Sequence, residues 1–500
     1  MTRRRSAPAR SLAVLGVALL AVSAAACMVG PNYSRPAVEQ PPAFKSELPA
    51  SPVTLPESDW WELYADPELT PLIAAANASN QTLRQAVARV DQARALARVA
   101  GSYLYPAISA NPAFSRTRYS ANRDSQFSGQ PVGQGSTISD WIITADLSYE
   151  IDVWGRVRRS FESARATAEA AAEDEAVVRL GVQADVASFY YTLRSLDAQD
   201  QILTQTVAAY REQVRILSVQ LKNGLVGAIV VYQAQATLQA ALAQLQDVQR
   251  ARADLEHALA ILAGQPAPSF SIPANPLLDA APPCVPAGLP ADLLIRRPDV
   301  AEAEQNVVAA NAQVGVATAD FYPRFMLTGY AGFESASASD LFNWQSRIAS
   351  ILPSIYFPIF QGGRLRANLA ATKAGYEETV AAYVQQVLVA YGDVEDALTD
   401  LRMFAEEVGS LREAVIASQN YLRLARAQFK YGLADYLLVI DAERTLLSNQ
   451  LLLAQTINLQ MGASVHLIKA LGGGWEGLPG PNTPPSGRDA DTKAGESPAS

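Results

Sequence analysis

Few side chains in this sequence have the types and spacing that enzymatic chemistry requires. The 500 residues include two histidines, His257 and His466, and both lie in helical patterns, which argues against a histidine-based metal site. Residues 472–477 match the dinucleotide fingerprint G-x-G-x-x-G, but they follow a helical pattern instead of a strand and precede a proline-rich tail. No G-x-S-x-G motif or phosphate-binding loop occurs. We therefore expect no catalytic residue, no cofactor and no bound metal.

The charged residues with the most suggestive spacing lie near position 440. Leu437 and Asp441 are four residues apart and share one helix face, and Arg444 follows three residues later. Arg444 can pair with Asp441 or with a neighbouring helix, and by spacing alone an ordinary surface ion pair is favoured. In a threefold assembly, however, Leu437 would form an apolar ring and Asp441 an anionic ring. A ring of carboxylates favours cations.

Charge and targeting signals exclude a nucleic-acid partner and indicate export. The net charge is −9, and no basic cluster occurs outside the N-terminus. Residues 1–26 contain a positive region, a short apolar run and small residues, as a signal peptide does. Cys27 follows at once, which predicts a lipoprotein site with Cys27 acylated; ordinary cleavage with a free Cys27 is the alternative. The other cysteine is Cys284, so an acylated Cys27 leaves no intramolecular disulfide.

The chain contains a tandem duplication. Gly432 and Gly224 occupy similar breaks between long helical patterns, and they are 432 − 224 = 208 residues apart. The same offset aligns two further pairs, Gly155 with Gly363 and Leu238 with Leu446. Three landmarks in constant register predict one structural unit that is built twice.

Proline content and periodicity predict the order of segments. These are a signal peptide (1–26), an extended and poorly structured tether (27–56), a first repeat (57–264), a Pro-rich linker (265–290), a second repeat (291–473) and a disordered tail (474–500). Each repeat is expected to hold a strand pair and a very long helical hairpin. The expected helices are Leu69 to Val99, Arg156 to Asn223, Val230 to Leu262, Asp299 to Ala319, Leu365 to Phe429 and Tyr436 to about Ala470. Between Leu365 and Phe429 apolar residues recur at alternating steps of three and four, which is typical of a coiled-coil seam. No segment after the signal peptide is expected to cross a bilayer as a helix.

Four segments alternate between apolar and polar residues and are predicted to be strands. They are Ala107 to Tyr119, Trp141 to Asp152, Phe325 to Phe333 and Ile348 to Phe360. Strands of about 9–11 residues can cross an outer membrane when tilted. A small periplasmic sheet packed on helices would show the same alternation and is the alternative.

In a membrane, four such strands require partners from other chains. Unpaired backbone groups at a sheet edge are not tolerated in lipid, and the smallest membrane barrels have about eight strands. Two chains would supply eight strands, which enclose a lumen filled by side chains, and three chains would supply twelve. The pattern therefore predicts a homo-oligomeric β-barrel continuous with a helical tube, without fixing the number of chains.

A series of motifs extends along the mature chain. These are Cys27-Met28-Val29-Gly30-Pro31-Asn32-Tyr33, Trp60-Trp61, Tyr149-Glu150-Ile151-Asp152-Val153-Trp154-Gly155-Arg156, Arg296-Arg297-Pro298-Asp299, Pro358-Ile359-Phe360-Gln361-Gly362-Gly363-Arg364 and Tyr431-Gly432 to Arg444. As an ordered set they closely resemble the TolC/OprM-type outer-membrane efflux proteins, in particular the lipoprotein (NodT) branch.

This resemblance implies an α+β fold made mostly of long α-helices, assembled as a homotrimer in the outer membrane. The trimer would form a twelve-stranded β-barrel continuous with a twelve-helix periplasmic tunnel. Its implied function is the passive exit duct of a tripartite pump for small molecules such as drugs, with a periplasmic adaptor and an inner-membrane transporter of the RND class as partners. The alternatives are an exit duct for type I protein secretion and a structural coiled-coil lipoprotein.

The resemblance also assigns the site residues. The periplasmic gate of the family maps onto Leu437, Asp441 and Arg444, and the adaptor-contacting helix tips map onto Gly224, Leu225, Gly432 and Leu433. One departure is that Ala228 and Val230 stand where the family usually has acidic residues, so the first tip is apolar. The adaptor contact or the outer part of the gate is therefore expected to differ from that of better-known members.

Overall fold

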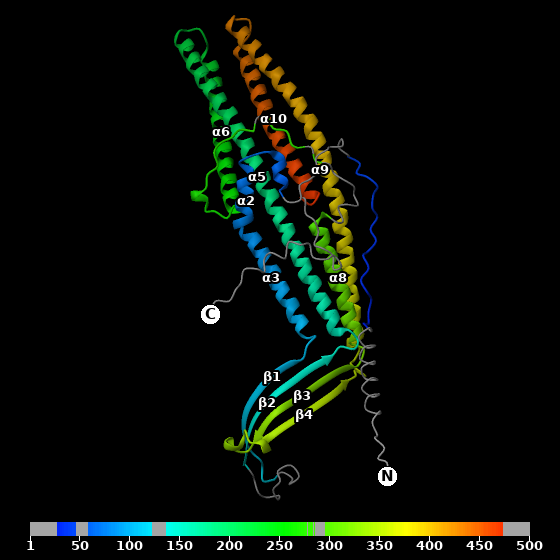
Figure 1. The fold of residues 1–500 in the computed structure, drawn as a ribbon. Helices are drawn as coiled ribbons and strands as arrows, with labels where there is room; N and C mark the ends of the chain where they lie inside the picture. Colours follow the sequence, from blue (N-terminus) through cyan, green and yellow to red (C-terminus); the bar gives the residue numbers. More distant parts are fainter. Residues whose placement is uncertain are drawn as a thin grey trace, which may run out of the picture. The chain divides into compact units, whose positions relative to one another are not determined.

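The computed structural model describes residues 28–46, 59–122, 137–277, 279–283, 285 and 296–473. The chain divides into two compact units. Unit 1 holds the described parts of Met1–Pro36, Val90–Ala170 and Ala303–Tyr383, and unit 2 those of Ala37–Arg89, Ala171–Glu302 and Val384–Ser500. Unit 1 contains the β-sheet, and unit 2 contains the tips of the helical hairpins (Figure 1).

Two helical hairpins of equal length confirm the tandem repeat. The first consists of α5 (Arg156–Lys222) and α6 (Ala228–Leu262), and the second of α9 (Arg364–Lys430) and α10 (Tyr436–Ala470). The long helices have 67 residues each and the short ones 35 each. The offset of 208 residues therefore holds for the start and the end of every helix in the hairpins, for example 364 − 156 = 208.

The predicted seam of α9 is the face that packs. Its members Tyr383, Val387, Val394 and Leu398 are fully buried, and the rest of the stripe is buried or half-buried. Some residues between the stripe positions, such as Leu388, are exposed, whereas the small Ala390 and Ala397 beside the stripe are buried with it. The alternating spacing therefore predicted which side of this helix faces the protein.

One expected helix is divided in two. The segment predicted as a single helix from Leu69 to Val99 forms α2 (Leu69–Ser79) and α3 (Gln81–Ser102), separated by Asn80 in an extended conformation. The Asn80 side-chain oxygen accepts from the backbone N–H of Leu83 at 3.0 Å and so caps α3, while its amide nitrogen donates to the carbonyl of Leu262 at 2.9 Å. Asparagine favours such caps because its side chain replaces a missing backbone partner.

The remaining helices flank these elements. They are α8 (Pro298–Ala319) and the short 3-10 helices η1 (Trp60–Tyr64), η2 (Ala267–Ser269), η3 (Ala338–Asp340) and η4 (Trp344–Ser346). Trp60 and Trp61 of η1 are buried in the main core of unit 2, with residues of α2, α5, α9 and α10. Within the described residues, one helix (α10) is long and apolar enough to cross a membrane, contrary to the expectation of none. More than half of its apolar window is buried in the protein, as in a core helix.

The four predicted strands form one antiparallel sheet in the order β1-β2-β3-β4. The strands are β1 (Ala107–Arg118), β2 (Thr137–Ile151), β3 (Arg324–Ser335) and β4 (Arg347–Tyr356). The first pair belongs to the first repeat and the second pair to the second repeat, so the two repeats meet at β2 and β3. β4 ends before Pro358, which has no N–H for a sheet bond.

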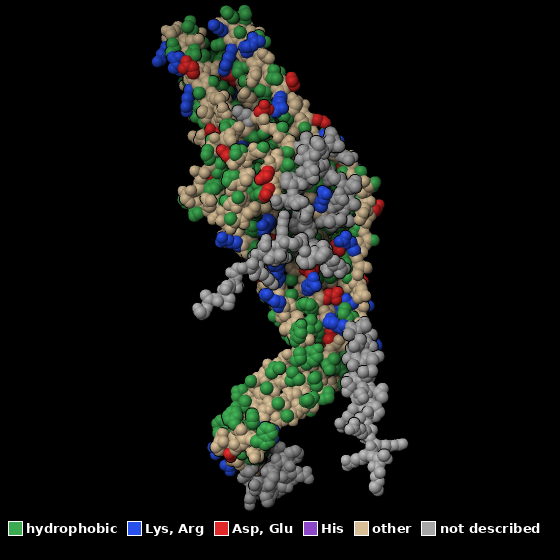
Figure 2. All heavy atoms as spheres, in the orientation of Figure 1, with side chains coloured by type: hydrophobic (Ala, Val, Ile, Leu, Met, Phe, Trp, Pro, Cys, Tyr) green, Lys and Arg blue, Asp and Glu red, His purple; other side chains and the backbone are tan. Residues whose placement is uncertain are grey.

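The register gives the sheet one apolar and one polar face. Residues that pair across strands share a face. On one face Phe114 pairs with Trp141, and on β3 and β4 the paired positions on this face include Phe325 with Ile355. Asp146 pairs with Ser109 and Tyr330 on the other face. Figure 2 shows hydrophobic side chains gathered over the strands. Within the described chain, β1 and β4 each have one edge without a partner strand.

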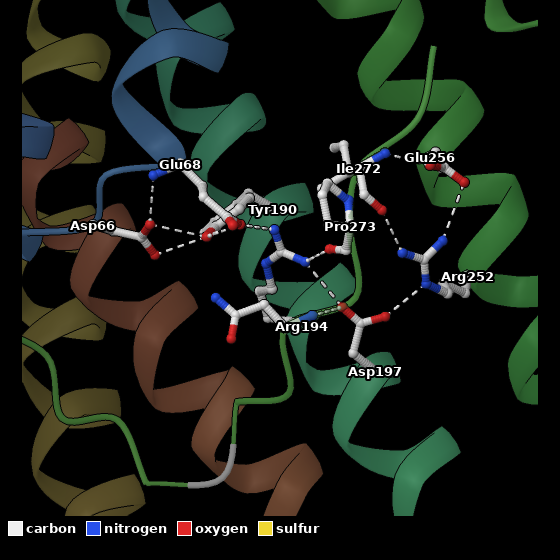
Figure 3. Close-up of polar contacts among 10 residues, drawn as sticks. Asp66, Glu68, Tyr190, Arg194, Asp197, Arg252, Glu256, Ile272 and Pro273 are labelled. Carbon is white, nitrogen blue, oxygen red and sulfur yellow. Dashed lines mark hydrogen bonds and ion pairs between the residues drawn. The ribbon is translucent and has the colours of Figure 1, made fainter. Parts of the chain in front are cut away.

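A buried polar cluster fixes part of the linker between the repeats (Figure 3). Arg194 of α5 donates to the carbonyl of Pro273 at 2.6 Å, and Arg252 of α6 donates to the carbonyl of Ile272 at 2.8 Å. Asp197 pairs with both arginines, at 3.0 and 2.6 Å. Removing one partner of so buried a pair leaves an uncompensated charge, at a cost of about 3–5 kcal/mol. The linker is therefore fixed to the first hairpin over these residues.

Candidate gate and docking surface

Both helical hairpins turn through the same motif. Gly224 and Gly432 follow the long helices with φ values of 75° and 69°. The backbone N–H of Leu225 donates to the carbonyl of Gln220, and that of Leu433 donates to the carbonyl five residues before it, both at 2.9 Å. This pattern is a Schellman motif, whose left-handed position favours glycine because a side chain would be strained there.

The leucine after each turn glycine points into solvent. Leu225 is 73% exposed and Leu433 is 77% exposed. In a Schellman motif this residue commonly packs on the last turn of the helix, but here the facing residues are Gln220 and Gln428. Each long helix also ends in a lysine, and Figure 2 shows Lys and Arg side chains around these ends. The tips therefore combine exposed apolar and basic side chains.

The three predicted gate residues lie together on one face of α10. Leu437, Asp441 and Arg444 are all exposed, and their spacing of four and three places them within one face. The opposite side of the same turns is buried and packs against α5, α6 and α9 through Tyr436, Val439, Ile440 and Ala442. In the described part of one chain, the face of α10 that carries the gate residues is therefore uncovered, and the opposite face holds the helix in place by packing.

Asp441 bonds to α9 instead of to Arg444. The hydroxyl of Tyr421 donates to the Asp441 carboxylate at 2.9 Å. This hydrogen bond raises the pKa of the Tyr421 hydroxyl. Among the described residues no ion pair within 4.0 Å joins Asp441 to Arg444, so the simple surface pair that the spacing favoured is not present. Asp441 therefore connects the two helices of the second hairpin.

Sequence reasoning missed a second carboxylate, Glu443, on the buried side of α10. Its side chain is 3% exposed and accepts from Arg426 of α9 at 2.9 Å. Burial raises the pKa of the Glu443 carboxyl, and the nearby Arg426 opposes that shift. One signal was available, because Glu443 lies seven residues after Tyr436 and so shares its buried helix face.

The predicted lipidation residue, Cys27, lies outside the described residues. The segment that follows it has no helix or strand but has fixed contacts in unit 1. Val29 donates through its N–H to the carbonyl of Trp154 at 3.1 Å, and Asn32 accepts from Arg159 of α5 at 2.6 Å. The hydroxyl of Tyr33 donates to Glu304 of α8 at 2.9 Å. This part of the predicted tether is therefore more ordered than expected.

Comparison with known proteins identifies the family. Residues 72–265 and 289–473 match the family model described as outer membrane efflux protein. The toluene efflux pump outer membrane protein TtgF of Pseudomonas putida is 33% identical over 471 residues, which cover 92% of this chain and 96% of TtgF. The cation efflux system protein CusC of Escherichia coli is 28% identical over 462 residues, covering 91% of this chain and 98% of CusC. The solved structure of the outer-membrane channel OprN matches with a TM-score of 0.83 and 29% identity, and the match covers 90% of this chain and 100% of the OprN chain. With the predicted long helices, strand pairs and tandem repeat all present, this chain belongs to the outer membrane efflux protein family.

Proposed function

We propose that this outer-membrane efflux protein is the channel component of a tripartite pump and conducts small molecules passively to the exterior. The observation that carries the proposal is that one chain holds both an apolar-faced, open-edged sheet and two long hairpins, the second of which exposes a charged stripe near its tip. Relatives that cover nearly the whole chain are named for toluene and cation efflux. Because those names differ, the cargo of this chain is left open.

The proposed assembly is a homotrimer. The free edges of β1 and β4 need partners in lipid, and neighbouring chains supply them without changing the pairing inside each chain. Three four-stranded sheets give a twelve-stranded barrel, and twelve hairpin helices form the periplasmic tunnel. Twelve strands enclose an open lumen, whereas eight enclose one that side chains fill.

The proposed gate consists of Leu437, Asp441 and Arg444. Threefold symmetry would bring three copies of this exposed stripe together around the axis. A ring of Asp441 carboxylates would then favour cations and would also repel itself, so that contacts such as the Tyr421 hydrogen bond are needed to hold it. No enzymatic role is proposed.

The proposed partners are a periplasmic adaptor protein and an inner-membrane transporter of the RND class. The adaptor would contact the turns at Gly224 and Gly432, where Leu225 and Leu433 are exposed. Exposed apolar side chains on a rigid turn are suitable anchors because little conformational entropy is lost on binding. Acylation of Cys27 would hold the same chain to the outer membrane.

Planar-bilayer conductance tests the channel and its gate. Asp441→Ala, alone or with Arg444→Ala, removes the anionic ring and its bond to Tyr421, so we expect a severalfold higher conductance of the isolated trimer and a weaker preference for cations. A structural coiled-coil lipoprotein would give no current in any variant. A type I secretion duct would conduct too, and genetic pairing with a protein-secreting transporter would identify it.

The matched control is Asp247→Ala. Asp247 is also an exposed helical acid, and among the described residues its ion-pair partner is Arg250 on the surface of α6. This change should leave conductance as in the wild type. Unchanged conductance of Asp441→Ala would refute the placement of the constriction on this stripe.

A further inference from the structure

Three arginines, here called the rim arginines, lie at one end of the sheet on its apolar face. Arg116 and Arg118 are in the last three residues of β1, and Arg347 is the first residue of β4. Steps of two along β1 place Arg116 and Arg118 on the face of Phe114, and Arg347 pairs with Phe333 on the same face. All three arginines are exposed. The apolar face therefore ends in a basic margin at the loop end of the sheet.

The rim arginines have no acidic partner in the described part of the chain. None of the three forms an ion pair within 4.0 Å with a described residue. At the other end of the sheet, where the helices begin, arginines are paired. Arg156 pairs with Glu150 at 2.6 Å, and Arg324 pairs with Asp320 at 2.5 Å. The unpaired guanidinium groups are therefore a property of the loop end.

The acids of the loop end lie on the other face of the sheet. Asp140 pairs with Ser115 and Glu334 pairs with Ile142, and all four are on the polar face. Neighbouring positions of a strand point to opposite sides, so these carboxylates are directed away from the rim arginines. Figure 2 shows Lys and Arg side chains at this end of the sheet. An anion that neutralises the rim arginines from the apolar side must therefore come from outside the chain.

Aromatic side chains accompany the rim arginines. The rings of Phe114 and Trp141 pack with their centroids 4.3 Å apart. In the connection between β3 and β4, Phe342 and Trp344 are 70% and 72% exposed, and the guanidinium of Arg347 lies over the ring of Trp344. Aromatic girdles mark the level of the headgroups around membrane barrels. Arginines beside such a girdle are at the right level to meet lipid phosphates.

The loop end of the sheet belongs to the outer leaflet in the proposed channel. The helices α3, α5, α8 and α9 all join the sheet at its other end. There the N–H of Val29 donates to the carbonyl of Trp154, three residues beyond β2, and Val29 is two residues after the predicted acylation site Cys27. An acyl anchor that is attached on the periplasmic side enters the inner leaflet. The rim arginines are at the opposite end, next to the exterior.

We propose that the rim arginines bind the phosphate groups of lipid A, the phosphorylated glycolipid of the outer leaflet. The fork of a guanidinium group matches phosphate oxygens with two parallel bonds, and the apolar face below would contact the acyl chains. In the trimer the strand order places β4 of one chain beside β1 of the next. Arg347 of one chain and the β1 arginines of the next then share one stretch of the margin. The inference rests on the proposed channel function, because the site is complete only in the closed barrel.

Titration of delipidated trimers with lipid A, followed by native mass spectrometry without divalent cations, tests this site. Arg116→Gln, Arg118→Gln and Arg347→Gln should each weaken the binding of lipid A about fivefold, and the triple variant more strongly. Arg118→Lys keeps the charge and should retain most of the affinity. Dephosphorylated lipid A should bind the wild type and the variants equally weakly, because its acyl chains meet only the apolar face. If the triple variant does not assemble, the single variants carry the test.

The matched control is Arg366→Gln. Arg366 is exposed near the start of α9, at the helical end of the sheet, and forms no ion pair with a described residue. Its removal should leave the affinity for lipid A as in the wild type. Equal affinity of the wild type and the triple variant, or equal binding of the phosphorylated and dephosphorylated lipid, would overturn the site.

Conductance of the same trimers separates this inference from the proposed function. The rim variants should conduct like the wild type, because the rim arginines face away from the lumen. If Asp441→Ala raises the conductance but the rim variants bind lipid A normally, the lipid site is refuted and the channel stands. If the wild-type trimer does not conduct, the channel function fails, whereas phosphate-dependent binding that the triple variant loses would still support the lipid site.

Discussion

Asp441 and Glu443 are separated by one alanine, and α10 places their carboxylates in opposite environments. Asp441 is exposed and accepts from Tyr421, whereas Glu443 is buried and accepts from Arg426. The spacing of two residues on a helix turns side chains to different faces. One short segment therefore carries a candidate pore-lining carboxylate and a candidate structural one.

A pH profile follows from the raised pKa of Glu443. The folded tip holds this proton more tightly than the unfolded chain, whose carboxyl titrates near 4.5. The stabilisation is therefore complete below about that pH and is lost as the pH rises through the raised value. The charged and titratable groups around Glu443 are Arg426 from α9, Tyr210 from α5 and Tyr436 from α10.

The comparison with Glu443→Gln isolates this contribution. The variant has no carboxyl to titrate at this position. The difference between its melting temperature and that of the wild type, measured by circular dichroism, should therefore shift in favour of the variant as the pH rises from 4 to 8. A difference in melting temperature between variant and wild type that stays constant over this pH range would contradict a raised pKa at Glu443.

At the scale of elements, the sheet has one face suited to contact with lipid and another suited to line a lumen. Most pairs on the face of Trp141 join apolar side chains, so this face extends across strands from both repeats, with Arg347 and Ser335 as exceptions near one end. Ile351 in the middle of β4 is 76% exposed on this face. Such a face is suited to lipid, and the polar face to a water-filled lumen.

Adjacent positions on β4 test this assignment. Ile351→Arg places a charge on the apolar face near mid-strand and should cost about 2–4 kcal/mol per chain in the membrane. Ser350→Arg, one residue away on the polar face, should be tolerated. The yield of folded oligomer in outer-membrane fractions measures both. Equal yields would mean that the sheet does not meet lipid in the proposed way.

At the scale of the whole molecule, the number of chains and the anchor are measured together. Native mass spectrometry of the protein released from outer membranes should show three chains, each heavier than its polypeptide by the acyl groups on Cys27. The open edges of β1 and β4 require the additional chains. A two-chain particle would contradict the twelve-stranded barrel, and a mass without acyl groups would contradict lipidation alone.

Much of this organisation was predictable because it depends on repeating patterns. The steps of three and four gave the packed face of α9, and the constant offset gave two hairpins of the same plan. Contacts between distant residues were not predictable. Nothing near Asn80 indicated that its side chain would cap a second helix and reach Leu262, and nothing near Tyr421 indicated a bond to Asp441 of α10. Such pairs depend on which helices become neighbours, and one sequence does not specify that.

The matching arm lengths of the two hairpins limit how this protein can change. Seven residues added to each arm of one hairpin alone would move its tip by about 10 Å, at 1.5 Å per residue, past the tip of the other. A partner protein that contacts both tips at once would then lose one of its two contact sites. Lengthening in evolution must therefore occur in both copies together, as paired insertions of whole heptads that also preserve the seam of α9.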